Sequence, residues 1–91
     1  VMVSPMQTNP RKLVATSYSG PAFELMFSVI CSQAIKAEIE SKIASLGESI
    51  AISGVEPEFN FHIHTNEPDK VIASCENQVE ITNIRISELG N

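Results

Sequence analysis

The stretch FELMFSV at residues 23–29 carries large apolar side chains at every second position, from Phe23 to Val29. Because successive side chains of a β-strand point to opposite faces of a sheet, this period of two predicts a strand whose odd positions face a core. The stretch FNFHIH at residues 59–64 has the same pattern and predicts a second strand, again with its odd positions on the core side. These two strands organise the rest of the chain.

A helix is predicted between these two strands. Ser32 can cap its N-terminus, and Gly47 is expected to stop it at the other end. The apolar residues between them recur at spacings of three and four, which is the helical period; they are Ile35, Ile39, Ile43 and Leu46. Residues 49–53 then predict a short strand, which the Gly-Val-Glu-Pro sequence at residues 54–57 is expected to break.

A second helix and a last strand are predicted after residue 64. Asn66 is the expected N-cap of the helix, Pro68 lies in its first turn, and Asp69 can complete a capping box. The apolar residues of this helix are Val71, Ile72 and Cys75. Residues 79–87 predict the strand, whose apolar residues are Val79, Ile81, Ile84 and Ile86.

The predicted element order is β-α-β-β-α-β, which for so short a chain predicts an α+β fold of the ferredoxin-like kind. In that fold a four-stranded antiparallel sheet in the order 4-1-3-2 carries both helices on one face. We assign the fold to residues 21–91. Residues 1–20 contain Pro5, Pro10 and Gly20 among many Ser, Thr and Asn, and are expected to form an N-terminal arm or an interdomain linker.

Composition limits the partners of this chain. The 91 residues carry a net charge of −5, with 6 basic against 11 acidic side chains, so we expect no nucleic-acid partner. No apolar run is long enough to span a membrane, and no signal peptide is evident at the N-terminus. Cys31 and Cys75 lack a C-x-x-C spacing and are expected to pack as small apolar residues, which fits a cytoplasmic location. The core lacks Trp and is thin, so self-association would stabilise it.

The least common chemistry in the sequence is the pair His62 and His64. The predicted strand places both imidazoles on the face that the helices leave open. In the predicted sheet the start of the first strand lies beside the end of the third, and Glu24 points to the same open face. Two imidazoles and a carboxylate can bind a divalent metal ion, zinc first. The alternative is that the histidines are solvated residues of an exposed face, with Glu24 hydrogen-bonded to one of them.

Three segments resemble the middle domain of the A-type subunit of bacterial fatty acid kinase: LGESI at 46–50, FHIHTNEP at 61–68 and NIRI at 83–86. The resemblance covers roughly residues 21–90. Relatives have an L-G-D-S strand entry, a V-H-V-H-T-N-D-P block and a closing N-I-K-I strand. In that family the H-x-H pair binds zinc together with a cysteine on the first strand, and Glu24 stands at the position of this cysteine. Some relatives carry a Y-E-V-M-Y block there, which FELMF at 23–27 resembles.

The resemblance also implies partners. It implies a homodimer, a covalently linked nucleotide-binding domain related to dihydroxyacetone kinase, and a region that contacts a fatty-acid-binding partner protein. The full assembly of that family phosphorylates the carboxylate of a fatty acid. The Mg²⁺-binding carboxylates and phosphate-binding loops of the kinase do not occur in this sequence, so we expect this chain by itself not to be an enzyme.

The leading hypothesis is therefore a non-catalytic metal-binding and dimerisation domain that acts as a scaffold in a fatty-acid-kinase-like protein. Two other classes of function are compatible with the sequence. One is a small metal-dependent hydrolase, in which Glu24, His62 and His64 hold a metal whose open position activates water. The other is a ligand-sensing regulatory module with a ferredoxin-like fold, an idea that depends on analogy of fold alone.

Overall fold

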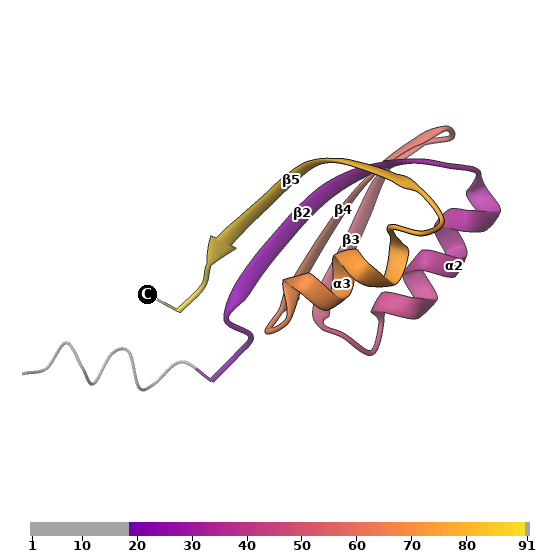
Figure 1. The fold of residues 1–91 in the computed structure, drawn as a ribbon. Helices are drawn as coiled ribbons and strands as arrows, with labels where there is room; N and C mark the ends of the chain where they lie inside the picture. The colour runs from indigo at the N-terminus through magenta and orange to yellow at the C-terminus, as the bar shows by residue number, and fades with distance from the viewer. Residues whose placement is uncertain (1–18, 91) are drawn as a thin grey trace, which may run out of the picture.

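The structure of the protein is a computed structural model that describes residues 19–90. Six elements follow one another along the chain (Figure 1). They are β2 (Phe23–Ile30), α2 (Gln33–Ile43), β3 (Glu48–Val55), β4 (Glu58–Thr65), α3 (Pro68–Cys75) and β5 (Glu80–Glu88). The predicted arm at residues 1–20 lies almost entirely outside the described residues.

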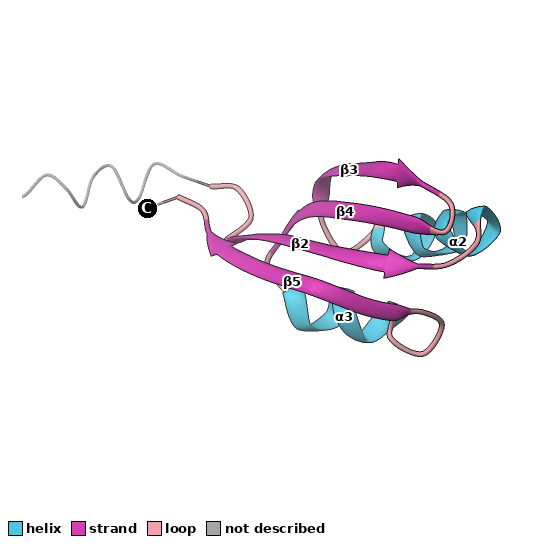
Figure 2. Cartoon of the chain, turned by 90° about the horizontal axis from the view of Figure 1, so that it is seen from above, coloured by secondary structure: helices cyan, strands magenta, loops and turns pink. Residues whose placement is uncertain are grey.

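The four strands form one sheet in the order β3-β4-β2-β5, and every neighbouring pair is antiparallel. Both helices lie on the same side of this sheet and leave the other side uncovered (Figure 2). This arrangement confirms the predicted ferredoxin-like α+β fold, including the central position of the first and third of its strands. The described helices have 11 and 8 residues, and neither is long and apolar enough to cross a membrane.

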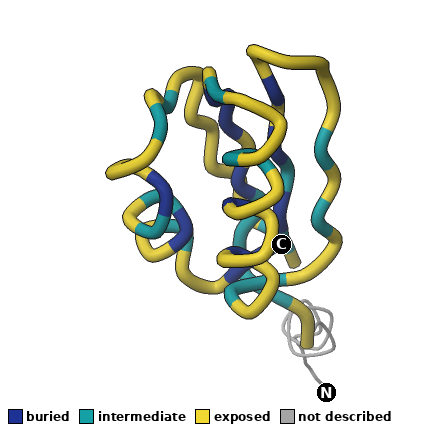
Figure 3. Tube along the Cα trace, turned by 90° about the vertical axis from the view of Figure 1, so that its right-hand side faces the viewer, coloured by how far each residue is buried: buried dark blue, intermediate teal, exposed yellow. Residues whose placement is uncertain are grey.

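The core lies between the sheet and the helices (Figure 3). The odd positions of β2 and β4 supply its sheet side, as the period of two predicted. Ten apolar side chains are at most 2% exposed: Leu25, Phe27, Val29, Ile39, Ile43, Phe59, Phe61, Ile63, Val71 and Cys75. The rings of Phe27 and Phe61 stack at its centre, with their centroids 5.2 Å apart. Cys75 is buried as predicted, Cys31 is half-buried against the core, and both are free thiols.

The first helix begins as predicted, but it does not end at the predicted glycine. The hydroxyl oxygen of Ser32 accepts a hydrogen bond from the backbone N–H of Ile35 at 3.2 Å. The helix ends at Ile43 with Ala44 as its C-cap, so Gly47 is not the helix stop. A Cβ added at Gly47 would overlap the carbonyl oxygen of His64 and come within 2.9 Å of the Ile63 side chain. Gly47 is therefore required by the close approach of its backbone to β4.

The predicted cap of the second helix is also wrong. The N-cap of α3 is Glu67, and no side chain accepts a capping hydrogen bond there. The side-chain oxygen of Asn66 instead accepts from the backbone N–H of Ala22 at 2.8 Å, which ties the chain before β2 to the end of β4. Asn66 and Asp69 thus do not form a capping box, because Asn66 already serves this long-range contact.

The two edge strands differ from their predicted course. β3 continues through Gly54 and Val55 to the turn before Glu58, so Gly54 does not break it. Gly54 has a φ of 99°, which suits glycine. Both edge strands also contain an irregularity at a non-glycine residue with positive φ, at Ser49 in β3 (56°) and at Asn83 in β5 (54°).

The irregularity in β5 explains the spacing of its isoleucines. Across it, two residues of β5 face one residue of β2, so the alternation of faces shifts by one. Ile81 pairs with Val29 and Ile86 with Leu25, which puts both isoleucines on the helix-covered side. Ile84 and Ile86 are nevertheless 49% and 51% exposed, because the second half of β5 is not covered.

Candidate metal centre

The pairing of the two central strands brings Glu24, His62 and His64 together. In the β2–β4 register Glu24 lies opposite His64, and Met26 lies opposite His62. Glu24 is therefore directly across from one histidine and diagonal to the other. The neighbouring positions Leu25 and Ile63 are buried against the helices, so the three polar side chains must point to the open face.

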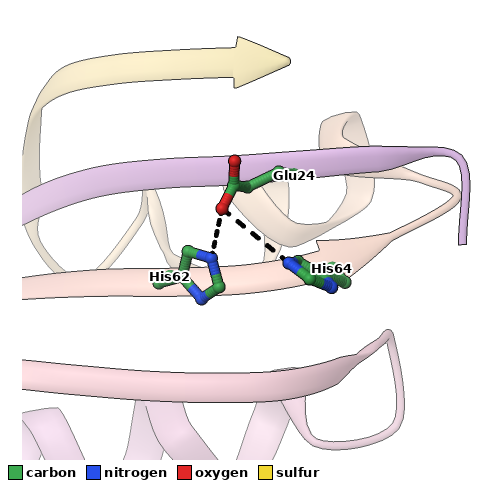
Figure 4. A group of neighbouring side chains, drawn as sticks. All are labelled: Glu24, His62 and His64. Atoms are coloured by element: carbon green, nitrogen blue, oxygen red, sulfur yellow. Dashed lines mark hydrogen bonds and ion pairs between the residues drawn. The ribbon is translucent and has the colours of Figure 1, made fainter. Parts of the chain in front are cut away.

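The carboxylate of Glu24 lies between the two imidazoles (Figure 4). Its Oε2 atom is 2.5 Å from Nε2 of His62 and 3.8 Å from Nε2 of His64. One donor atom from each residue falls within 4.8 Å of the other two. The side chains are 29%, 29% and 26% exposed for Glu24, His62 and His64, so a ligand on the open face can reach them. All three residues singled out from the sequence are thus neighbours in the structure.

The second ring nitrogen of His62 faces another acceptor. Its Nδ1 atom lies 3.2 Å from the backbone carbonyl oxygen of Ser49 on β3. The positive φ of Ser49 lies at the β3 irregularity, immediately before this carbonyl. Sequence analysis missed Ser49, because nothing in the residue type predicts a left-handed backbone at this position.

The surroundings of His62 fit a cation at Nε2. A neutral imidazole has only one N–H, but both nitrogens of His62 face oxygen acceptors. Either the ring carries two protons, or Nδ1–H donates to Ser49 while the Nε2 lone pair binds a metal ion that Glu24 also contacts. The second arrangement is the common one for histidine ligands, which usually donate their other N–H to a carbonyl or carboxylate.

The spacing of the donor atoms fits a metal ion as well. Two ligands of a tetrahedral zinc ion lie about 3.3 Å apart when each bond is about 2.0 Å. The observed separations from Glu24 Oε2, 2.5 Å and 3.8 Å, lie on either side of that value. Small side-chain rotations on the two adjacent strands are enough to equalise them.

Comparison with known proteins places the chain in a family. The family model for the FakA-like middle domain of fatty acid kinase matches residues 20–91. The chain belongs to this family. No curated protein and no solved structure matches it. The family match covers the whole α+β domain and confirms the resemblance noted from the three sequence segments.

Within this middle domain, other ligands are not assembled around the three residues. Among residues 19–90, no further His, Cys, Asp or Glu joins the group within the same span. Glu48 lies opposite His64 on β3, on the side away from Glu24, and Ser87 lies opposite Glu24 on β5. The centre thus offers three protein ligands.

The thiols of the middle domain belong to its packing. Burial raises the pKa of the Cys75 thiol, which donates a hydrogen bond to the carbonyl oxygen of Val71 at 3.1 Å. Burial also raises the pKa of Cys31, and the charge of Glu56 adds to this effect. A raised pKa keeps both groups in the thiol form, which is a poor metal ligand.

Proposed function

We propose that this middle domain binds a divalent metal ion, zinc first, through Glu24, His62 and His64, and that it acts as a non-catalytic scaffold. The observation that carries the proposal is the position of His62 Nε2. This atom lies against Glu24 while Nδ1 of the same ring faces the Ser49 carbonyl. Imidazole nitrogen and carboxylate oxygen are ligands that zinc accepts, although they also suit other divalent ions.

Each residue has a defined part in the proposed centre. His62 and His64 bind through Nε2, Glu24 binds through Oε2, and the Ser49 carbonyl fixes the orientation of the His62 ring. When bound, the metal links the two central strands and neutralises the Glu24 charge. A ligand that binds only the folded state stabilises it, by about 2.7 kcal/mol at a concentration of 100 times Kd.

The scaffold role is supported by the family to which the chain belongs. In the proposed parent protein, the domain lies between a nucleotide-binding kinase domain and a region that contacts a fatty-acid-binding partner. Kinase chemistry is then carried out by the linked domain, and the metal serves the fold of the middle domain. We place the protein in the cytoplasm, a location that the two free thiols favour.

The proposed scaffold is a homodimer. Its support is exposed apolar surface on a small domain: Met26 and Ile30 on the open face are 39% and 44% exposed. Covering such surface with a second copy would stabilise both copies by about 25 cal/mol for each Å² buried. Light scattering across a range of concentrations tests this part, and a monomer at the highest concentration would contradict it.

Metal analysis tests the metal centre. We expect the purified 91-residue chain to bind one zinc ion per chain, and the double variant His62→Ala, His64→Ala to bind none. Glu24→Gln should weaken zinc binding, whereas Glu58→Gln should leave it unchanged. Glu58 is a matched control because it lies on β4 and is exposed, at the opposite end of the strand from His64. Equal zinc content in the double variant and the parent chain would refute the site.

A further inference from the structure

The open face continues past the metal centre to a basic side chain on β5. The registers place His62, Met26 and Arg85 opposite one another on three neighbouring strands. Arg85 is also diagonal to Glu24, whose partner on β5 is Ser87. Two hollows flank Met26 on this face, one of about 280 Å³ that Arg85 lines and one of about 170 Å³ that His62 lines.

The positive charge of Arg85 is not matched by the described part of the chain. Among residues 19–90, no carboxylate lies within ion-pair distance of its guanidinium group. Glu24, the acidic residue diagonal to it, is already engaged by the two histidines. An arginine holds a carboxylate through two parallel hydrogen bonds, so its guanidinium is suited to an anion from outside.

The floor of the larger hollow offers a further donor. The buried hydroxyl of Ser28, only 5% exposed, donates to Oδ1 of Asn60 at 2.7 Å and accepts from Nδ2 of Asn83 at 3.4 Å. Because the oxygen of Asn60 is directed to Ser28, its NH₂ group remains available on the open face. Arg85 and Asn60 therefore present donors on either side of the apolar Met26 side chain.

We propose that a carboxylate group binds on this face between the metal centre and Arg85. One carboxylate oxygen takes the metal position that the three protein ligands leave free, and the other accepts from the Arg85 guanidinium. This inference rests on the proposed metal function. A divalent ion with one carboxylate ligand has a net charge of +1, and Arg85 adds another, so the pair attracts an anion although the whole chain carries −5.

The span between the two groups suits such a ligand. Neighbouring strands are about 4.8 Å apart, so β5 lies about 10 Å from β4, with β2 between them. An Arg85 side chain extended across Met26 covers most of this distance and packs its methylene groups on the exposed thioether. The carboxylate then bridges what remains.

Visible absorption of the Co²⁺-loaded 91-residue chain, titrated with acetate, tests the inference. Co²⁺ serves as a coloured substitute for zinc, and its spectrum changes when a carboxylate enters the coordination shell. We expect a saturable change, and Arg85→Met should weaken acetate binding about 10- to 100-fold, as expected for the loss of a charged hydrogen bond. Co²⁺ affinity itself should change little. The charge control Lys70→Met, on α3 behind the sheet, should leave acetate binding unchanged.

The outcomes separate the two proposals. A chain that does not bind Co²⁺ refutes the metal centre itself. A chain that binds Co²⁺ without a response to acetate refutes only the carboxylate site, and would indicate that a protein group such as Glu48 fills the free position. Equal acetate affinity in Arg85→Met removes the role of Arg85, and tighter binding of inorganic phosphate than of acetate overturns the choice of carboxylate.

Discussion

The two central strands and the two edge strands of this sheet differ in regularity. β2 and β4 pair without interruption from Phe23 to Ile30, whereas each edge strand has a register shift at a residue with positive φ. The central pair holds Glu24 and both histidines. The edges supply what surrounds them, the Ser49 carbonyl on β3 and Arg85 on β5. Regular strands thus set the spacing of the candidate ligands, and irregular strands adjust their environment.

The same comparison applies to packing. Apolar side chains of the central strands are covered by helices, while Ile84 and Ile86 of the edge strand β5 remain half exposed. An edge can carry a bulge because little packs against it. Bulges on both edges also hinder pairing with further strands, which protects an open sheet from aggregation.

The largest expected effect is on packing. Phe61→Ala removes a ring that is 2% exposed and stacked on Phe27, so it should lower the free energy of unfolding by about 3–5 kcal/mol. Ile86→Ala on the edge strand should lower it by less than about 1 kcal/mol, since half of that side chain is already in water. Urea unfolding followed by circular dichroism measures both. Similar losses would mean that centre and edge are packed alike.

Zinc should separate the two regions next. At 100 times Kd, zinc should raise the free energy of unfolding of the parent chain by about 2.7 kcal/mol. It should have no such effect on the double variant His62→Ala, His64→Ala. Urea titrations with zinc and with a chelator measure the difference. Equal zinc-dependent stabilisation of both proteins would show that the ion binds elsewhere.

The central strands could be predicted from the sequence because their chemistry repeats with a fixed period. FELMFSV and FNFHIH define the faces of β2 and β4, and the pairing of two antiparallel neighbours then brings Glu24 to the histidines. The edge features could not be predicted, because they depend on tertiary contacts. Ser49 and Asn83 adopt positive φ without being glycine, and Gly47 responds to a backbone that passes close to it rather than to the end of a helix.

Gly47 joins the helix to the edge strand, and a side chain there should disturb the metal centre. Gly47→Ala would place a Cβ against the His64 carbonyl, so either the loop or the end of β4 must move. We expect a loss of about 1–3 kcal/mol in the free energy of unfolding, typical of overpacking, together with weaker zinc binding. Ser53→Ala, at an exposed position of β3, is the control and should change neither. Unchanged zinc affinity in Gly47→Ala would mean that the loop alone yields.

The smallest effect on stability should distinguish the two bulges by function. Ser49→Val and Asn83→Val each place a β-branched residue at positive φ, which should cost about 1 kcal/mol in either strand. Only Ser49 orients the carbonyl that accepts from His62, so Ser49→Val should also weaken zinc binding about 10-fold or more, as is common when a partner of a histidine ligand is lost. Isothermal titration of the two variants compares them directly. If both lose zinc affinity equally, the effect comes from general strain in the sheet, and the Ser49 carbonyl has no specific part in holding His62.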